Sequence, residues 1–208
     1  MPSSDSRQNK PSHESAWNLA WERFKETRSR GRTTTVVGSS ECEEIPVLDG
    51  SVKVDEKCEL ITSSLPEYHR LLGIVVLHYL TTDKELGWDG HWSLFRQMLG
   101  GESFHQAFHG RIVTPLAKSF SPRPQVLLEA GRRLKGTVID FGDATVILPF
   151  LPRLPVRVTV WKGDDEVPGN AVILFPSNAD RLLPTEDLVE VGDVVLRSLL
   201  RASLSSDR

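Results

Sequence analysis

Residues 142–175 read GDATVILPFLPRLPVRVTVWKGDDEVPGNAVILF, and this stretch decides the fold. Apolar residues recur with a period of two in Ala144–Leu148, Val156–Lys162 and Ala171–Phe175, as expected of strands. Short segments rich in proline, glycine and aspartate separate these runs, and short turns join strands in an antiparallel manner. With one more strand expected at Thr137–Asp140, the stretch predicts an antiparallel meander in the C-terminal half.

Helical periodicity is found on both sides of this meander. Apolar residues recur every three or four positions, the spacing of one helix face, in the segments Ser15–Thr27, Tyr68–Leu80, Glu102–Val113, Pro124–Lys135 and Thr185–Leu204. These helices come before and after the strands instead of alternating with them, an order typical of the α+β class. We therefore predict an α+β fold in which an antiparallel sheet packs with about five helices.

Individual residues indicate where these elements begin and end. Ser64 and Glu67 have the spacing of a capping box ahead of the second helix. Pro115 has no amide hydrogen, so it is expected to kink or restart the third helix, with Thr114 as the cap. Pro149, Pro152 and Pro155 cannot donate to a strand ladder, so they are expected in connections or at a sheet edge.

One domain is expected, flanked by short tails. Residues 1–13 are polar and predict a disordered N-terminal tail, and residues 205–208 are expected to form a disordered C-terminal end. The single α+β domain would then span residues 14–204. Within it, residues 36–61 are expected to form strands, with a hairpin turn at Asp49–Gly50.

Composition argues against several classes of protein. A net charge of −3 gives no general attraction to nucleic acid or to an anionic membrane. The longest apolar run, Leu71–Leu77, is far shorter than the ~20 residues that span a bilayer, and no apolar signal segment is visible. Cys42 and Cys58 are too widely spaced for a CxxC site and are expected to be ordinary thiols. We therefore expect a cytoplasmic protein with no membrane or nucleic-acid partner.

The segment Thr81–Gly101 is long, irregular and rich in tryptophan and glycine, as functional or mobile loops often are. Its Trp88, Asp89, His91 and Trp92 combine flat aromatic surface with a carboxylate and an imidazole. These side chains are expected to bind a planar or sugar-like ligand, and His91 could carry a proton near neutral pH. The alternative is a loop that its aromatic side chains anchor to the core.

The turn after the third meander strand carries the densest charge cluster in the chain. Its Asp164, Asp165 and Glu166 could bind a hard cation such as Mg²⁺ or Ca²⁺, although their spacing is not that of an EF-hand loop. The alternative is a solvated turn between strands. The neighbouring Trp161 favours a site and is itself a candidate ligand contact.

Three histidines offer further alternatives. His105 and His109 stand four apart on the third helix and could share a metal ion if a third ligand came from elsewhere. His78 lies inside the apolar second helix, so we expect a core residue with a hydrogen-bond partner. A functional role for it is the alternative.

Three charged residues complete the candidates for a ligand site. Asp143, in the tight turn FGD, could contact a ligand or bond to its own backbone. Arg111 and Arg153 could meet an anionic ligand or pair with the acidic turn.

Several separated motifs resemble one uncharacterised prokaryotic family. They are LLGIVVLHYL (Leu71–Leu80), DGHWSLFRQMLGGESF (Asp89–Phe104), the 142–175 stretch and LLPTEDL (Leu182–Leu188). They occur in the same order in the family catalogued as domain of unknown function 3786, and the resemblance covers roughly Trp17 to Leu200. The family has a tyrosine where Phe104 stands, so any role of that hydroxyl is absent here.

The resemblance implies a cytoplasmic bacterial or archaeal protein, often from an anaerobe. Some members are joined to an iron–sulfur domain of the kind found beside corrinoid proteins, which suggests a role in one-carbon or redox metabolism. This chain has two cysteines and therefore lacks the four of such a domain. The resemblance accordingly implies an iron–sulfur or corrinoid protein only as a partner in trans, and it supplies no catalytic residues.

Three functional hypotheses follow. No nucleophile–base constellation, P-loop or dinucleotide motif is visible, so the leading hypothesis is a non-catalytic accessory or binding protein. It would hold a small ligand or a partner's cofactor in a cleft between the Trp-rich segment Thr81–Gly101 and the turns of the sheet. One alternative is a metal-assisted hydrolase or transferase, with the acidic turn and the base His91 inside a site about 10 Å across. The other is a structural subunit of a complex.

Overall fold

The structure is a computed structural model that describes residues 13–30, 42–82 and 85–204. The predicted tails lie outside these residues, except His13, which already belongs to the first helix. The beginning of the predicted strand region, residues 36–41, also lies outside them. The described residues form an α+β fold with antiparallel sheets, as the sequence predicts.

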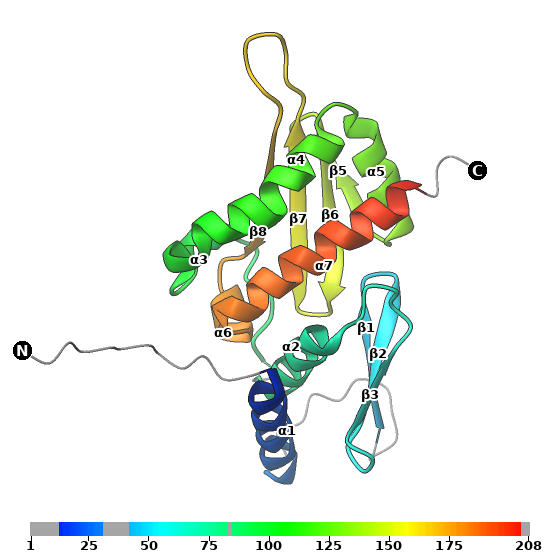
Figure 1. The fold of residues 1–208 in the computed structure, drawn as a ribbon, viewed down its shortest axis with the longest axis vertical. Coiled ribbons are helices and arrows are strands. Elements are labelled where there is room, and N and C mark those ends of the chain that lie inside the picture. Colours follow the sequence, from blue (N-terminus) through cyan, green and yellow to red (C-terminus); the bar gives the residue numbers. More distant parts are fainter. Residues whose placement is uncertain (1–12, 31–41, 83–84, 205–208) are drawn as a thin grey trace, which may run out of the picture.

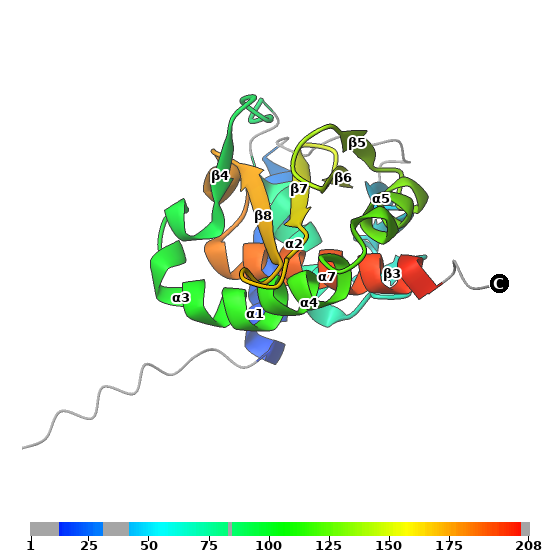
Figure 2. The ribbon, with the colours of Figure 1, turned by 90° about the horizontal axis from the view of Figure 1, so that it is seen from above.

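The larger sheet has five antiparallel strands in the order β4-β8-β7-β6-β5. Its strands are β4 (Trp92–Leu94), β5 (Thr137–Ile139), β6 (Ala144–Leu151), β7 (Leu154–Trp161) and β8 (Asn170–Pro176). The last four are consecutive in the chain and pair with their sequence neighbours, which confirms the predicted meander. The remaining strand, β4, comes from far earlier in the chain and lies at the edge beside β8 (Figure 2).

The N-terminal part adds a smaller antiparallel sheet and two helices. Its elements are α1 (His13–Ser29), β1 (Cys42–Val47), β2 (Gly50–Asp55), β3 (Leu60–Ser63) and α2 (Arg70–Thr81). The turn between β1 and β2 falls at Leu48–Asp49, next to the predicted hairpin position. Among the described residues, no helix combines the length and the apolar character needed to cross a membrane.

The other helices are α3 (Gly101–Phe108), α4 (Thr114–Phe120), α5 (Pro124–Arg133), α6 (Ala179–Leu182) and α7 (Thr185–Leu204). Most of them cover one face of the larger sheet. A π-helical turn (His109–Val113) joins α3 to α4. α3 and α4 run diagonally across the sheet, and α7 lies beside them (Figures 1 and 2). α7 buries the apolar stripe that its sequence predicts, including Leu188, Val191, Val195 and Leu199.

Pro115 affects the third predicted helix differently from the prediction. The helix does not restart there, because α3, the π-helical turn and α4 form one continuous helical segment. A proline ring crowds the carbonyl of the preceding turn and removes one amide donor, and the wider π-helical turn before Pro115 accommodates both effects. Thr114 is not a cap, and its amide bonds to the carbonyl of His109, five residues earlier. Such π-helical turns frequently occur at functional sites.

The start of α2 also corrects the prediction. Its N-cap residue is His69, which makes no side-chain capping bond, so Ser64 and Glu67 do not form a capping box. Glu67 is buried instead, and its Oε1 accepts a bond from Arg201 of α7 at 2.5 Å. Arg201 also bonds Asp49 at 3.0 Å. Leaving a buried carboxylate without a partner costs more free energy than leaving a helix without a side-chain cap.

Two further expectations differ from the structure. The segment Thr81–Gly101, predicted to be irregular, contains β4 and a 3₁₀ turn (Phe95–Gln97). Pro152 lies in the turn between β6 and β7, as expected, whereas Pro149 and Pro155 lie within these strands at positions without a ladder partner. The register between these strands shifts after Leu148, which is the kind of irregularity that accommodates proline in a sheet.

Gly131 provides a test of how α5 packs on the sheet. A Cβ at Gly131 would lie 2.5 Å from Cγ1 of Val146 on β6, so Gly131→Ala is expected to reduce the free energy of unfolding by about 1–3 kcal/mol. Gly110→Ala is the matched control, since a Cβ there would meet nothing within 4 Å and alanine favours a helix. Urea denaturation measures both variants, and equal stabilities would contradict this packing.

Candidate functional site

A pocket opens where β4 stops pairing with β8. β4 pairs only with Leu174–Pro176, the last part of β8. The chain then leaves the sheet through the 3₁₀ turn at Phe95, so no described strand lies beside Asn170–Ile173 on that side. A pocket of about 460 Å³ follows this open edge, between β8 and the helical segment that contains the π-helical turn.

The backbone of β8 directs hydrogen-bonding groups toward this open edge. The carbonyl of Val160 on β7 accepts the amide of Asp143, so the backbone of Val160 faces β6. Ala171 is the partner of Val160 across the ladder, so its backbone amide and carbonyl point away from β7. The amide of Ala171 bonds to the side-chain oxygen of Asn170 at 2.8 Å. Ile173, two residues along, faces the same open edge.

Aromatic rings form the floor of the pocket. Phe95 of the 3₁₀ turn and Phe108 of α3 stack with ring centroids 4.2 Å apart, and Phe175 of β8 meets both rings edge-on. All three side chains are buried. Val113, at the end of the π-helical turn, adds an apolar wall. This floor is part of the hydrophobic core and holds the pocket's shape.

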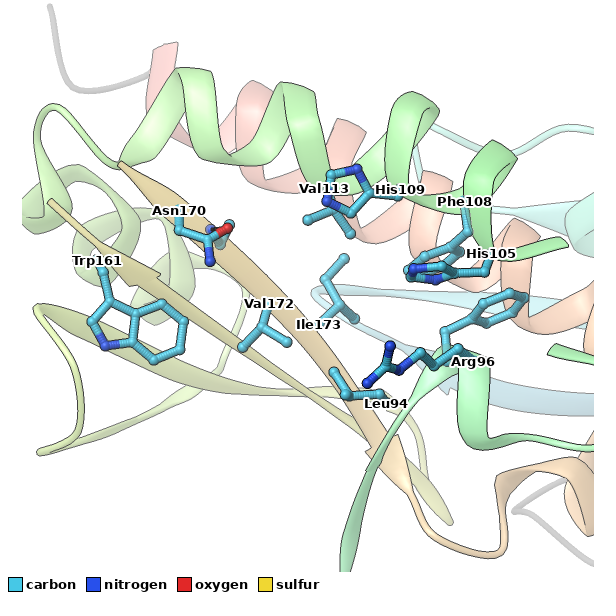
Figure 3. A pocket seen from close by; sticks show the side chains of 12 residues that line it. Leu94, Arg96, His105, Phe108, His109, Val113, Trp161, Asn170, Val172 and Ile173 are labelled. Carbon is cyan, nitrogen blue, oxygen red and sulfur yellow. Dashed lines mark hydrogen bonds between the residues drawn. The ribbon is translucent and has the colours of Figure 1, made fainter. Parts of the chain in front are cut away.

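Polar and aromatic side chains stand around this floor. Figure 3 shows Trp161 and Asn170 at one end of the open edge, and Arg96 and His105 at the other. His109 lies between them on the π-helical turn. The Nδ1 atom of His105 is buried without a hydrogen-bond partner, so a ligand that reached it would satisfy an otherwise unmet bond.

The pocket is electrostatically one-sided. Among the described residues that line it, none is an aspartate or a glutamate, whereas Arg96 carries a permanent positive charge. His105 and His109 add ring nitrogens that can donate hydrogen bonds. The arrangement favours a ligand with an apolar body and an anionic or hydrogen-bond-accepting group.

The structure combines candidates that the sequence had assigned to separate sites. Trp161 was predicted as a ligand contact beside the acidic turn, and His105 and His109 as a pair of metal ligands, yet all three line this pocket. Sequence reasoning missed Arg96, because its position depends on a long-range strand pairing that leaves no periodic signal. It also missed the π-helical turn, for which Pro115 within a helical pattern was the available signal.

Residues Trp88–Trp92, which we call the Trp loop, lie at the end of β8 opposite to Asn170. Asp89 accepts the amide of His91 at 3.0 Å and the hydroxyl of Ser177. These bonds, the one from Ser177 first, lower the pKa of Asp89. Trp88 donates to the carbonyl of His91 at 3.3 Å, and its ring centroid lies 5.0 Å from that of Trp92. These internal contacts match the anchored-loop alternative, and a ligand for these side chains stays a prediction.

The acidic turn projects from the end of the β7–β8 hairpin, at the top of Figure 1. Asp164 accepts the amides of Glu166 and Val167 at 2.9 and 2.7 Å, so it stabilises its own turn. These bonds, that of Val167 first, lower the pKa of Asp164. Asp164, Asp165 and Glu166 do not bring three ligand atoms within 4.8 Å of one another. These contacts match the solvated-turn alternative, and a metal site at this turn stays a prediction.

The same topology separates the acidic turn from His91. β8 begins at Asn170, opposite Trp161, and ends at Pro176, opposite Trp92. A strand of this length spans roughly 20 Å. The metal-assisted hypothesis required both groups within a site about 10 Å across. The structure therefore does not support their combination in one active site.

Two other candidates have structural partners. Asp143 accepts the amide of Lys162 at 2.8 Å. This bond links its turn to the end of β7 instead of to the backbone of the turn itself. The Nδ1 atom of His78 lies 2.7 Å from Oδ2 of Asp187 on α7. His78 therefore has the hydrogen-bond partner expected of a histidine in the core.

The arginine candidates meet neither the pocket nor the acidic turn. Arg111 is exposed and lies 3.9 Å from Asp193 of α7. Asp193 has a carboxylate neighbour on the same helix, Glu190. Burial and, second, repulsion from Asp193 raise the pKa of Glu190 to about 7. Arg153 lies between β6 and β7, at the end of the sheet away from the acidic turn. It donates to the hydroxyl of Tyr79 at 3.1 Å and lies over that ring.

Comparison with known proteins supplies a family. Residues 28–198 match the family described as Domain of unknown function (DUF3786). The chain belongs to the DUF3786 family. This confirms the resemblance seen in the sequence motifs, and the DUF3786 match contains every residue that lines the pocket. Comparison with curated proteins and with solved structures finds no match.

Phe108 and His109 are neighbours in the chain with different roles in the pocket. Phe108→Ala is expected to reduce the free energy of unfolding by about 3–5 kcal/mol, because it removes a buried, stacked ring from the floor. His109→Ala, at an exposed position, is expected to change stability by less than about 0.5 kcal/mol. Thermal and urea denaturation measure both values. A large effect of His109→Ala would contradict this assignment of floor and rim.

Proposed function

We propose that the protein is a binding protein that holds a small, largely apolar ligand along the open edge of β8. The observation that carries the proposal is the pocket itself, with its aromatic floor, its permanent positive charge and no acidic lining residue. Sites for small molecules typically combine an apolar surface with a few polar groups that orient the ligand. The pocket has this composition.

Each part of the pocket would make a different contribution to binding. The Phe95–Phe108 floor would bury the apolar body of the ligand. Arg96 would pair with an anionic group, and His105 would supply the bond that its Nδ1 atom lacks. The open edge at Ile173 would offer backbone groups that orient the ligand. None of these groups needs to take part in a reaction.

The proposal extends to a partner and a location. The ligand could be a free small molecule or a cofactor carried by another protein. The family resemblance supports an iron–sulfur or corrinoid protein in trans, in the cytoplasm and in anaerobic one-carbon or redox metabolism. We propose no nucleic-acid partner, because a net charge of −3 gives no general attraction to a polyanion.

Anilinonaphthalene sulfonate is a suitable probe, because it joins a planar apolar body to one anionic group. Fluorescence titration of the folded protein is expected to show one site, and Arg96→Gln is expected to weaken binding about tenfold by removing a charge-assisted bond. Trp161→Leu is expected to weaken it as well, because Trp161 lines the pocket.

Trp88→Leu is the matched control for the probe experiment. Trp88 is 45% exposed and lies in the Trp loop, outside the pocket, so its replacement is expected to leave the affinity unchanged. Circular dichroism of each variant confirms that it is folded. Binding that Arg96→Gln and Trp161→Leu leave intact would refute the proposed site.

A second candidate function follows from the backbone of β8. A partner's extended segment could pair with Ala171–Ile173 and continue the sheet where β4 leaves it, as in strand addition. This is a specific form of the structural-subunit hypothesis. It uses the same open edge but requires main-chain bonds along several residues of the partner.

The openness of this edge is testable in the isolated protein. The amide of Ile173 faces the open edge, whereas that of its ladder partner Val158 faces β6. Hydrogen exchange followed by NMR is expected to be at least about 100-fold faster at Ile173 than at Val158. A bound strand would slow exchange at Ile173 selectively. Equal protection of both amides in the free protein would show that the edge is already closed.

A further inference from the structure

A cluster of metal-ligating side chains lies between the start of α2 and α7, and none of its residues lines the pocket. His69 is the N-cap residue of α2, and Glu190 and Asp193 lie three residues apart on α7. One potential ligand atom from each of the three side chains lies within 4.8 Å of the others. The three side chains are half-buried, with Glu190 the least exposed at 13%. Arg197 stands one turn further along the same helix.

The contacts of the cluster bring its potential ligand atoms together. Nε2 of His69 lies 2.8 Å from Oε1 of Glu190, which is an ion pair when the imidazole is charged. Arg197 contacts the same Nε2 atom. Oε1 of Glu190 is otherwise buried without a hydrogen-bond partner. An imidazole nitrogen and a carboxylate oxygen thus meet beside a guanidinium.

A positive charge placed beside both atoms of this contact would stabilise them. Arg197 supplies that charge in part, since its Nη2 atom is 3.9 Å from Glu190 and its Nε atom is 2.9 Å from Asp193. The guanidinium of Arg197 thus approaches an imidazole and two carboxylates, and that of Arg111 lies 3.9 Å from Asp193. The three ligand-bearing side chains converge on one cationic position.

The spacing of the three atoms suits a metal ion at that position. Ligands at about 2.1 Å from one ion lie about 3–4.2 Å apart. The contact of 2.8 Å and the limit of 4.8 Å bracket this range, so small rotations of the side chains would complete the set. Imidazole and carboxylate ligands together are typical of Zn²⁺, Fe²⁺ and Mn²⁺.

We propose that His69, Glu190 and Asp193 form a binding site for one divalent transition-metal ion, which displaces the guanidinium of Arg197. The ion would join the N-terminus of α2 to the middle of α7. Open coordination positions would face solvent, because His69 and Asp193 are 31% and 23% exposed. The site is separate from the β8 pocket and does not depend on the function proposed for it.

Isothermal titration with Zn²⁺ and with Mn²⁺ tests the site in the full chain. The wild-type protein is expected to bind one equivalent of at least one of the two ions. Glu190→Gln, Asp193→Asn and His69→Ala are each expected to weaken binding at least tenfold, as loss of a ligand does. Arg197→Gln is expected to strengthen it about tenfold, because it removes a positive charge that competes for the same position.

Glu186→Gln is the matched control, because Glu186 is an exposed carboxylate one turn before Glu190 on the same helix. It is expected to leave the affinity unchanged. Glu190→Gln and Asp193→Asn keep the side-chain shape, so they remain informative if His69→Ala fails to fold. The visible spectrum of the Co²⁺ complex gives a second readout, and the ligand variants are expected to change it.

Three results would overturn the proposal. The first is the absence of stoichiometric binding in both the wild type and Arg197→Gln. The second is wild-type binding that Glu190→Gln and His69→Ala leave intact, which would place the metal elsewhere. The third is binding by Arg197→Gln alone, which would make the natural cluster an ion-pair network between α2 and α7.

Discussion

The three-residue pairing between β4 and β8 is the constraint on which the candidate site depends. The edge strand ends at Leu94 because the chain turns into the 3₁₀ turn and then into α3. That turn and α3 are held close together, since a Cβ at Gly101 would lie 2.1 Å from the carbonyl oxygen of Phe95. Only glycine permits this approach. The same contact brings Phe95 against Phe108 and so forms the floor of the pocket.

The regular elements of the fold follow from local sequence, whereas the site does not. The meander from Thr137 to Phe175 and the stripe of α7 are periodic signals that burial enforces, and the structure contains both. The pocket depends on β4, which is too short to give a periodic signal and pairs with a strand about 80 residues away along the chain. Its polar groups could therefore be recognised only after the chain had been folded.

The wrong capping prediction has a physical cause in tertiary structure. Glu67 does not cap α2, because Arg201 gives this buried carboxylate a charged partner. Here a tertiary contact outweighs a preference that is visible in a few consecutive residues.

α7 connects the two candidate sites. Gly192 lies between Glu190 and Asp193, and a Cβ there would lie 2.8 Å from Cε2 of Phe108 in the pocket floor. The helix thus packs the pocket floor with one face and carries the charged cluster on another. The carboxylates of the acidic turn, by contrast, lie on an exposed turn between two strands. A rigid helix holds ligand atoms in place better than a loop does.

The most direct test of the pocket is a two-dimensional NMR titration with small aromatic carboxylates. We predict that the amide signals of Ala171 and Ile173 and the indole signal of Trp161 shift together and saturate, while the indole signal of Trp88 stays in place. Shifts confined to Trp88 and Trp92 would locate binding in the Trp loop and contradict the assignment of the site to β8. The absence of any saturable shift would likewise show that the open edge of β8 is not a site for ligands of this class.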